Sequence, residues 1–270
     1  MFFGGISGSA VADVSSIGTM LIPMMKEKGY DDDFSVGVTV TSACQGVIIP
    51  PSIPFIMYGM ASGASVSDLF IAGIIPGLLI GILLMVYAFY YCRKHGEDKL
   101  RIRTEVQKLH DRSLVTVLKD SFFAILSPVI ILGCIYSGVA SPTEAAVISV
   151  FYALIISLLV YKSIHLRDLG EIFKEAIRTF PPILFILAAS TAFSRVLTLM
   201  QVPQTVSELI SSNFHSKIII LFIINAFLLI VGMVMDTTPA ILILTPILLP
   251  IATNIGVNPI QFGVIMVVNL

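Results

Sequence analysis

Residues 34–60 read FSVGVTVTSACQGVIIPPSIPFIMYGM, and this stretch decides how the chain folds. It is apolar and helical in pattern as far as residue 49, but prolines at positions 50, 51 and 54 interrupt it. Proline removes a backbone donor and clashes with the preceding turn. We therefore predict a helix that breaks within residues 45–52 and resumes over residues 55–60.

The composition places this broken helix in a membrane. Of the 270 residues, 56% are hydrophobic and 12% are charged, and the mean hydropathy is +0.97. Soluble domains carry about 25% charged residues, and one bilayer span needs about 20 apolar residues. The chain is predicted to be an all-α polytopic membrane protein. The net charge of −1 offers no basic surface for nucleic acid.

The charges predict the topology. Two connections, residues 93–120 and 162–178, hold twelve of the sixteen Lys and Arg, so we expect both to be cytoplasmic loops. Counting the predicted membrane spans from these loops toward the N-terminus puts residues 26–33 on the same side. Residues 61–68, 138–141, 201–216 and 253–258 then lie on the opposite face. A Ser-Pro-Thr-Glu sequence at 141–144 predicts a helix start with a capping box.

An internal repeat appears when the chain is displaced by 227 positions. Pro23 then meets Pro250, and Gly29 meets Gly256. The matched loops fall on opposite membrane faces, so the repeat is predicted to be inverted. Inverted repeats with re-entrant hairpins and broken helices are typical of secondary transporters.

The repeat predicts three regions. Residues 1–60 form the first half of a transport domain, with a hairpin tip at 5–13 and the broken helix at 34–60. Residues 61–216 form connecting and scaffold helices, and residues 217–270 form a truncated second half. Both ends lie in apolar runs, so we expect an internal piece of a longer protein. A second Pro-Pro break is expected about seven residues past the end of this chain.

Three clusters are candidate binding residues. The first hairpin tip offers hydroxyl, carbonyl and carboxylate oxygens, which suit an alkali cation, although Ser9 and Asp13 also fit an ordinary helix start. The carbonyls of the helix break could line the same site, or the prolines could simply kink a packed helix. The second tip matches the first, but Asp236 before Pro239 also fits an N-cap. The candidates are Ser7, Gly8, Ser9 and Asp13; Gln45, Pro50, Pro51 and Ser52; and Met235, Asp236, Thr237 and Thr238.

Other functions remain as alternatives. Asp13 and Asp236 lie in broken membrane segments and could form the proton-sharing pair of an intramembrane aspartyl protease. A serine protease built on Ser7 would lack a base, because no membrane segment offers a histidine or lysine to activate it. An ion channel would show a filter repeated by subunit symmetry. A structural membrane component would leave the two aspartates unexplained.

Several motifs together resemble one family. These are GGISGSAVAD at 4–13, IIPPS at 48–52, LFIAGIIPG at 69–77, SPTEAA at 141–146 and ILTPILLP at 243–250. The combination resembles the large membrane subunit, of DctM type, of tripartite ATP-independent periplasmic (TRAP) transporters. The resemblance covers the whole chain, and it implies that the family's first and last helices are missing.

The resemblance implies a function and partners. It implies a multi-pass protein of the bacterial inner membrane that imports organic anions such as C4-dicarboxylates or sialic acids. Sodium is the coupling ion, and no other cofactor or enzyme activity is expected. A periplasmic binding protein delivers the substrate, a small four-helix membrane subunit braces the permease, and the transport domain moves as an elevator. Ser7, Ser9 and Asp13 would hold sodium, and the outer turn with Ser65 would contact the binding protein.

Overall fold

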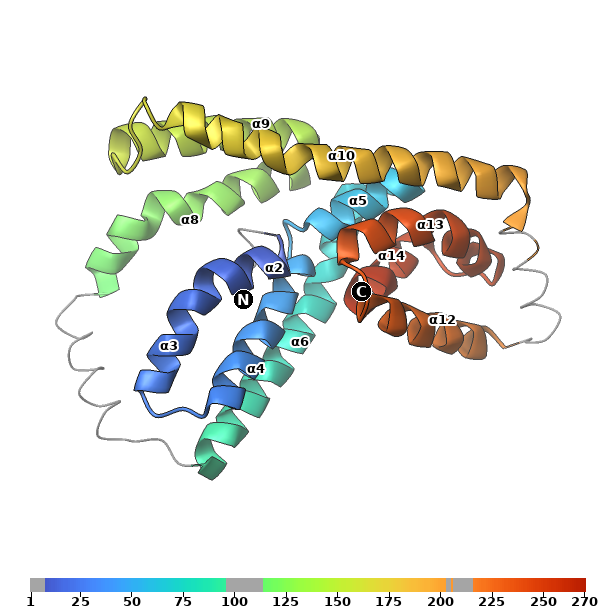
Figure 1. Ribbon diagram of the computed structural model, residues 1–270, viewed down its shortest axis with the longest axis horizontal. Helices are drawn as coiled ribbons and strands as arrows, with labels where there is room; N and C mark the ends of the chain where they lie inside the picture. Colours follow the sequence, from blue (N-terminus) through green and yellow to red (C-terminus); the bar gives the residue numbers. More distant parts are fainter. Residues whose placement is uncertain (1–7, 96–113, 203–204, 206–215) are drawn as a thin grey trace. The chain divides into compact units, whose positions relative to one another are not determined.

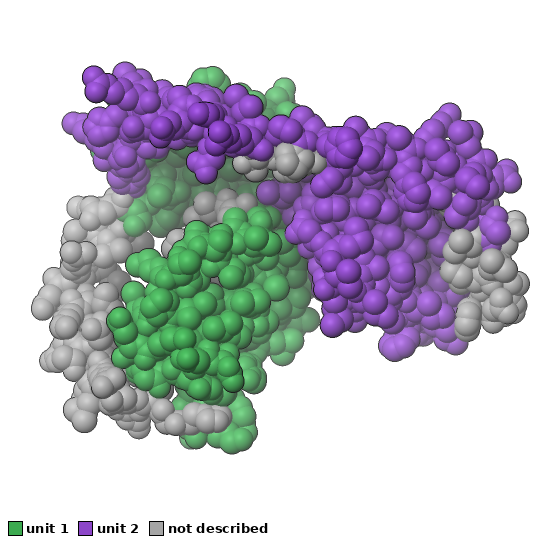
Figure 2. Space-filling model, in the orientation of Figure 1, with its two compact units in different colours: residues 1–52, 73–160 green, residues 53–72, 161–270 purple. Residues whose placement is uncertain are grey.

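The computed structural model describes residues 8–95, 114–202, 205 and 216–270, which form helices and turns with no strand among them. The fold is all-α, as predicted. Packing divides the chain into two compact units (Figure 2). Unit 1 comprises Met1–Ser52 and Gly73–Val160, and unit 2 comprises Ile53–Ala72 and Tyr161–Leu270. The functional division at residues 60 and 216 stays a prediction.

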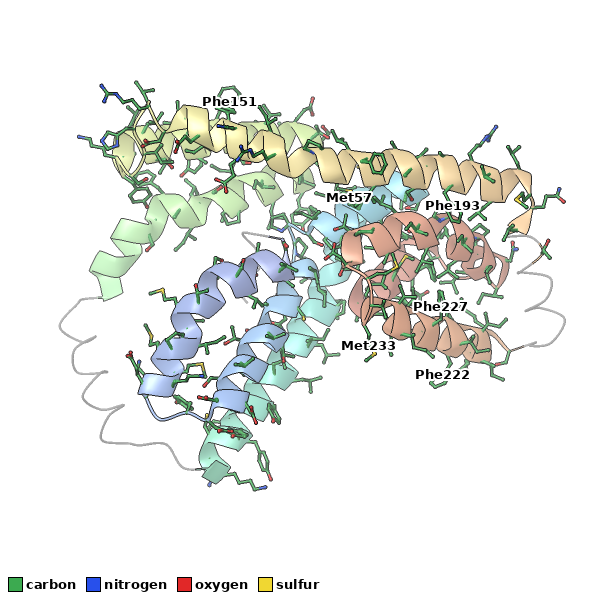
Figure 3. All side chains as sticks on the ribbon, viewed as in Figure 1. Met57, Phe151, Phe193, Phe222, Phe227 and Met233 are labelled. Carbon is green, nitrogen blue, oxygen red and sulfur yellow. The ribbon has the colours of Figure 1, made fainter. Side chains whose placement is uncertain are left out.

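The helices have the character of membrane spans. Among the described residues, three helices are long and apolar enough to cross a bilayer, namely Val66–Lys94, Pro142–Val160 and Thr237–Asn254. Large apolar side chains are exposed on the surfaces of these and the shorter apolar helices (Figure 3). Phe151 of the second long helix is 63% exposed, and Phe222 of a shorter helix is 73% exposed. Such surfaces are costly in water and suited to lipid. The chain is a polytopic membrane protein.

Unit 1 opens with two antiparallel helical arms (Figure 1). Helix α2 (Ala10–Asp13) continues through a π-helical turn (Val14–Gly18) into α3 (Thr19–Glu27), and α4 (Asp32–Ala43) returns beside it. Near the connecting loop, Phe34 stacks on Tyr91 of α6 (Val66–His95) with ring centroids 4.0 Å apart. This contact ties the base of the arms to α6.

The predicted break follows α4. The chain tightens into a 3₁₀ turn, η2 (Cys44–Val47), passes through Pro50 and Pro51, and resumes as α5 (Ile53–Ser62). Gly77 of α6 lies against this break, since a Cβ built there would be 2.9 Å from Ile49 Cγ1 and 3.4 Å from Ile48 Cγ2. The absent side chain lets the irregular backbone pack closely on a regular helix.

The rest of unit 1 is a helical hairpin. Helix α8 (Leu114–Tyr136) contacts α9 (Pro142–Ile155), which ends in a π turn (Ile156–Val160). The predicted capping box is present: Ser141 Oγ accepts from the Glu144 amide at 3.4 Å, and Glu144 Oε2 accepts from the Ser141 amide at 2.8 Å. These bonds satisfy orphan donors at the start of α9.

The basic connections are not loops throughout, which corrects the prediction. Helix α6 continues to His95, α8 begins at Leu114, and α10 (Leu169–Leu199) begins well inside residues 162–178. Basic residues decide on which side a connection stays, but Lys, Arg and Glu are also good helix formers. A helix already formed therefore propagates into the charged sequence. At 1.5 Å per residue α10 is about 46 Å long, more than the roughly 30 Å of a hydrocarbon core.

Unit 2 contains a second hairpin. Helices α12 (Lys217–Gly232) and α13 (Thr237–Asn254) contact each other, and Lys217 Nζ donates to the Gly256 carbonyl at 2.9 Å across their open ends. The tip of the hairpin is the turn at residues 233–236. Helix α12 is about 24 Å long, which is less than the roughly 30 Å of a hydrocarbon core, and a re-entrant course of this hairpin stays a prediction.

Helix α14 (Pro259–Asn269) packs against α5 and α13. Tyr58 of α5 is fully buried and donates to the Pro259 carbonyl at 2.7 Å. The next turn of α14 has Gly263, where a Cβ would lie 2.4 Å from Tyr58 Cε1 and 2.7 Å from Leu69 Cδ2. Only glycine fits at this crossing.

The repeat predicted from the sequence is a structural repeat. Ser9 and Asp236, 227 positions apart, are both N-caps, and the helices that they begin end at Glu27 and Asn254, also 227 apart. Gly29 and Gly256 follow with φ of +87° and +75°. The return helices begin after N-caps at matching positions, Asp31 and Asn258.

Backbone hydrogen bonds repeat at the same displacement. The Tyr30 amide donates to the Met25 carbonyl at 3.2 Å, and the Val257 amide donates to the Ala252 carbonyl at 2.9 Å. Each bond closes the helix end beside its left-handed glycine. The two halves share one local fold, and its inversion across the membrane stays a prediction.

Replacing Gly263 by valine should destabilise unit 2. The new side chain overlaps Tyr58 and Leu69, both fully buried, and overpacking of this kind costs about 1–3 kcal/mol. The melting temperature of the purified permease in detergent measures the effect. Gly133→Val in α8 is the matched control, because nothing lies within 4 Å of its Cβ position. Equal melting temperatures for the two variants would contradict the crossing described above.

Candidate functional site

The first hairpin tip begins with a left-handed residue. Gly8 has φ of +63°, a conformation that glycine adopts without a steric penalty. Ser9 follows as the N-cap of α2, and its Oγ accepts from the Ala12 amide at 3.4 Å. The capping interpretation of Ser9 is confirmed, and a ligand role for Ser9 stays a prediction. Ser7 lies outside the described residues.

Asp13 is the buried charge of this tip. The residue is 6% exposed, and within the described part of the chain its carboxylate makes no hydrogen bond or ion pair. The π turn Val14–Gly18 begins directly after it, and such turns are frequent at functional sites. A carboxylate held in an apolar medium without a partner is costly. Asp13 is therefore a candidate cation ligand, and this role stays a prediction.

The helix break lies against this tip, since η2 contacts α2. Gln45 and Ser52 are both buried, at 1% and 0% exposure. The Ser52 hydroxyl donates to the Val47 carbonyl. The Gln45 carbonyl accepts from the amides of Ile48 and Ile49 at 3.1 and 2.9 Å. That carbonyl is thus engaged within the turn, and a ligand role for the carbonyls of the break stays a prediction.

The side chain of Gln45, one of the predicted candidates, is the open polar group of the break. Within the described residues, its Oε1 and Nε2 are both buried without a hydrogen-bond partner. The great majority of buried polar groups in proteins have a partner, so this amide is a candidate ligand-binding group. Pro50 and Pro51 contribute the break itself, and their peptide bond is cis.

The second tip has a different role in the structure. Asp236 is exposed and caps α13, with its carboxylate accepting from the Thr238 amide at 3.3 Å. Thr237 Oγ1 donates to the Leu270 carbonyl at 3.0 Å, so the tip packs on the end of α14. The N-cap interpretation of Asp236 is confirmed. A ligand role for Met235, Asp236, Thr237 and Thr238 stays a prediction.

The repeat shows that the two tips are chemically unequal. In register, Asp13 corresponds to Ala240, and both are buried. Gly18 lies against Thr39 in the first half, and the matching residues of the second half are Thr245 and Met266. The Thr245 hydroxyl contacts Met266 Sδ at 3.4 Å. The same backbone carries a buried carboxylate in the first half and an alanine in the second. Of these two matched positions, only Asp13 offers a charge that a cation could compensate.

The outer turn before α6 holds Ser65. This residue is exposed, and its Oγ accepts from the Asp68 amide at 3.3 Å. Such a bond is a helix cap and needs no partner protein. Contact with a binding protein stays a prediction.

Comparison with known proteins places the whole chain in one family. A family model described as "Tripartite ATP-independent periplasmic transporter, DctM component" matches residues 1–270. The isethionate TRAP transporter permease protein DctMQ of Oleidesulfovibrio alaskensis is 41% identical over the whole chain. The sialic acid large permease SiaM of Vibrio cholerae is 37% identical, and the C4-dicarboxylate large permease DctM of Pseudomonas aeruginosa is 36% identical, again over the whole chain.

The chain spans 42% of the length of the first relative and 62% of each of the other two. All three are named as transporter permeases, which rules out the alternative of an intramembrane protease. The matched motifs, the helical membrane fold and the shared permease relatives lead to one conclusion. The chain belongs to the DctM component family of the tripartite ATP-independent periplasmic transporters.

Proposed function

We propose that this chain forms part of the membrane permease of a sodium-coupled transporter, which imports organic acid anions across a bacterial inner membrane. The observation that carries the proposal is the buried residue Asp13, whose carboxylate has no partner among the described residues. A sodium ion would compensate this charge, and the carboxylate oxygen is the type of ligand that hard cations prefer. The coupling ion is then bound in the first half of the repeat.

The substrate class follows from charge. A cation bound at Asp13 attracts an anion to a site that would otherwise repel it. The relatives named above are permeases for isethionate, sialic acid and C4-dicarboxylate, which share an acidic group and differ in size. These names support an organic acid as the substrate and leave the particular acid open.

The partners follow from the family. Its description as tripartite and periplasmic supports a soluble periplasmic binding protein and a small membrane subunit as partners. The outer turn around Ser65 is the proposed contact for the binding protein. The two hairpins are proposed to move together with bound sodium and substrate, as in an elevator mechanism.

Asp13→Asn should weaken sodium binding at least about tenfold, because the variant keeps the size of the side chain and removes its charge. Binding of radioactive sodium to the purified permease measures the change. Asp68→Asn is the control, since Asp68 is exposed at the start of α6. Unchanged sodium affinity in Asp13→Asn would show that the cation binds elsewhere.

Uptake into proteoliposomes tests the activity as a whole. The complete transporter complex, with its binding protein, is offered radiolabelled isethionate, sialic acid and succinate. We expect an inward sodium gradient to accelerate uptake of at least one of them about tenfold or more, because ion and anion stabilise each other's binding. Uptake at equal rates with and without the gradient would refute sodium coupling.

A further inference from the structure

The Gln45 amide differs from the other buried polar side chains of unit 1. Ser35 and Thr39 of α4 are buried, and each donates to the carbonyl four residues earlier, at 2.8 and 2.7 Å. Ser52 also donates to a backbone carbonyl. Within the described residues of this unit, Gln45 alone has buried side-chain atoms without a partner. The packing around Gln45 thus provides no hydrogen-bond partner for its side chain, although the neighbouring polar side chains have partners.

An amide side chain needs two kinds of partner. Oε1 accepts hydrogen bonds or coordinates cations, and Nε2 donates two hydrogen bonds. A cation satisfies only the oxygen, and an anion satisfies only the nitrogen. Each group left unmet in a buried site carries a desolvation penalty. A cation and an anion bound side by side would satisfy both ends.

The neighbouring charge fixes which ligand belongs where. η2 packs against α2, which carries the buried Asp13. An anion placed next to Asp13 would be repelled, whereas a cation would be held. A neutral amide beside that cation offers donors to an anion and adds no second negative charge.

We propose that the Gln45 side chain binds the sodium ion through Oε1 and a carboxylate or sulfonate oxygen of the substrate through Nε2, and so couples the two. This proposal rests on the proposed function. The ion fixes the orientation of the amide and thereby presents the donors to the substrate. By linkage, the substrate stabilises the bound ion by the same factor.

Two variants and one control test the bridge in the complete permease complex. Gln45→Leu removes both polar ends at similar volume, and Gln45→Glu keeps an oxygen for the cation but repels the anion. Cys44→Ala is the matched control, since Cys44 is exposed in the same turn. The binding of radioactive sodium, and of the anion that the wild type takes up from the three named above, is measured at several sodium concentrations.

In the wild type, sodium should raise the anion affinity about tenfold or more, and in Gln45→Leu this increase should fall at least about fivefold. Gln45→Glu should bind sodium at least as tightly as the wild type while binding the anion at least about tenfold more weakly. Ligand-free Gln45→Leu should also melt at a higher temperature than the wild type, because an unpaired buried amide has been removed. Cys44→Ala should match the wild type in all three measurements.

The bridge is overturned if Gln45→Leu keeps the full sodium effect on anion affinity, even where one ligand alone binds more weakly. It is also overturned if ligand-free Gln45→Leu melts at a lower temperature, since the amide would then support the fold. Failure of sodium coupling itself is distinguishable, because the wild type would then show no effect of sodium on the anion.

Discussion

A backbone that leaves the helical conformation inside an apolar medium must find new partners for its polar groups, and the architecture of unit 1 follows from this constraint. The chain leaves the helix at η2, after α4. Several of the freed groups find partners locally: the Gln45 carbonyl accepts from two amides, and the Val47 carbonyl accepts from the Ser52 hydroxyl. Gly77 lets α6 cover the turn closely. Among the described side chains of this unit, the Gln45 amide is left without a partner, and η2 contacts the helix that carries buried Asp13.

The repeat distinguishes features that satisfy backbone hydrogen bonds from side chains that belong to a candidate binding site. Caps, left-handed glycines and helix ends recur at one fixed displacement, from Ser9 and Asp236 to Gly29 and Gly256. These features satisfy backbone groups, and both halves must satisfy them alike. The buried positions are free to differ, and Asp13 against Ala240 shows that they do. A duplicated fold can therefore carry a buried charge in only one of its two halves.

The sequence predicted the features that depend on local chemistry. Prolines 50, 51 and 54 indicated the break, the Ser141–Glu144 spacing indicated the capping box, and the 227-residue displacement indicated the repeat. It predicted the helix limits less well around α6, α8 and α10, because charge bears on topology more than on backbone conformation. The open amide of Gln45 could not be foreseen, since whether a glutamine finds a partner depends on packing between segments. The role of Asp236 as a cap was one of two interpretations, and only geometry separated them.

The contact between Tyr58 and Pro259 has a consequence for how the protein is made. The two residues are 201 positions apart, yet they share a partly buried hydrogen bond. Ribosomes add about 5–20 residues per second, so α5 waits roughly 10–40 s for its partner helix to be synthesised. During that interval Tyr58 and its apolar neighbours need another cover within the insertion machinery or the lipid. Membrane insertion of α5 and its final packing are thus separate events in the biogenesis of the protein.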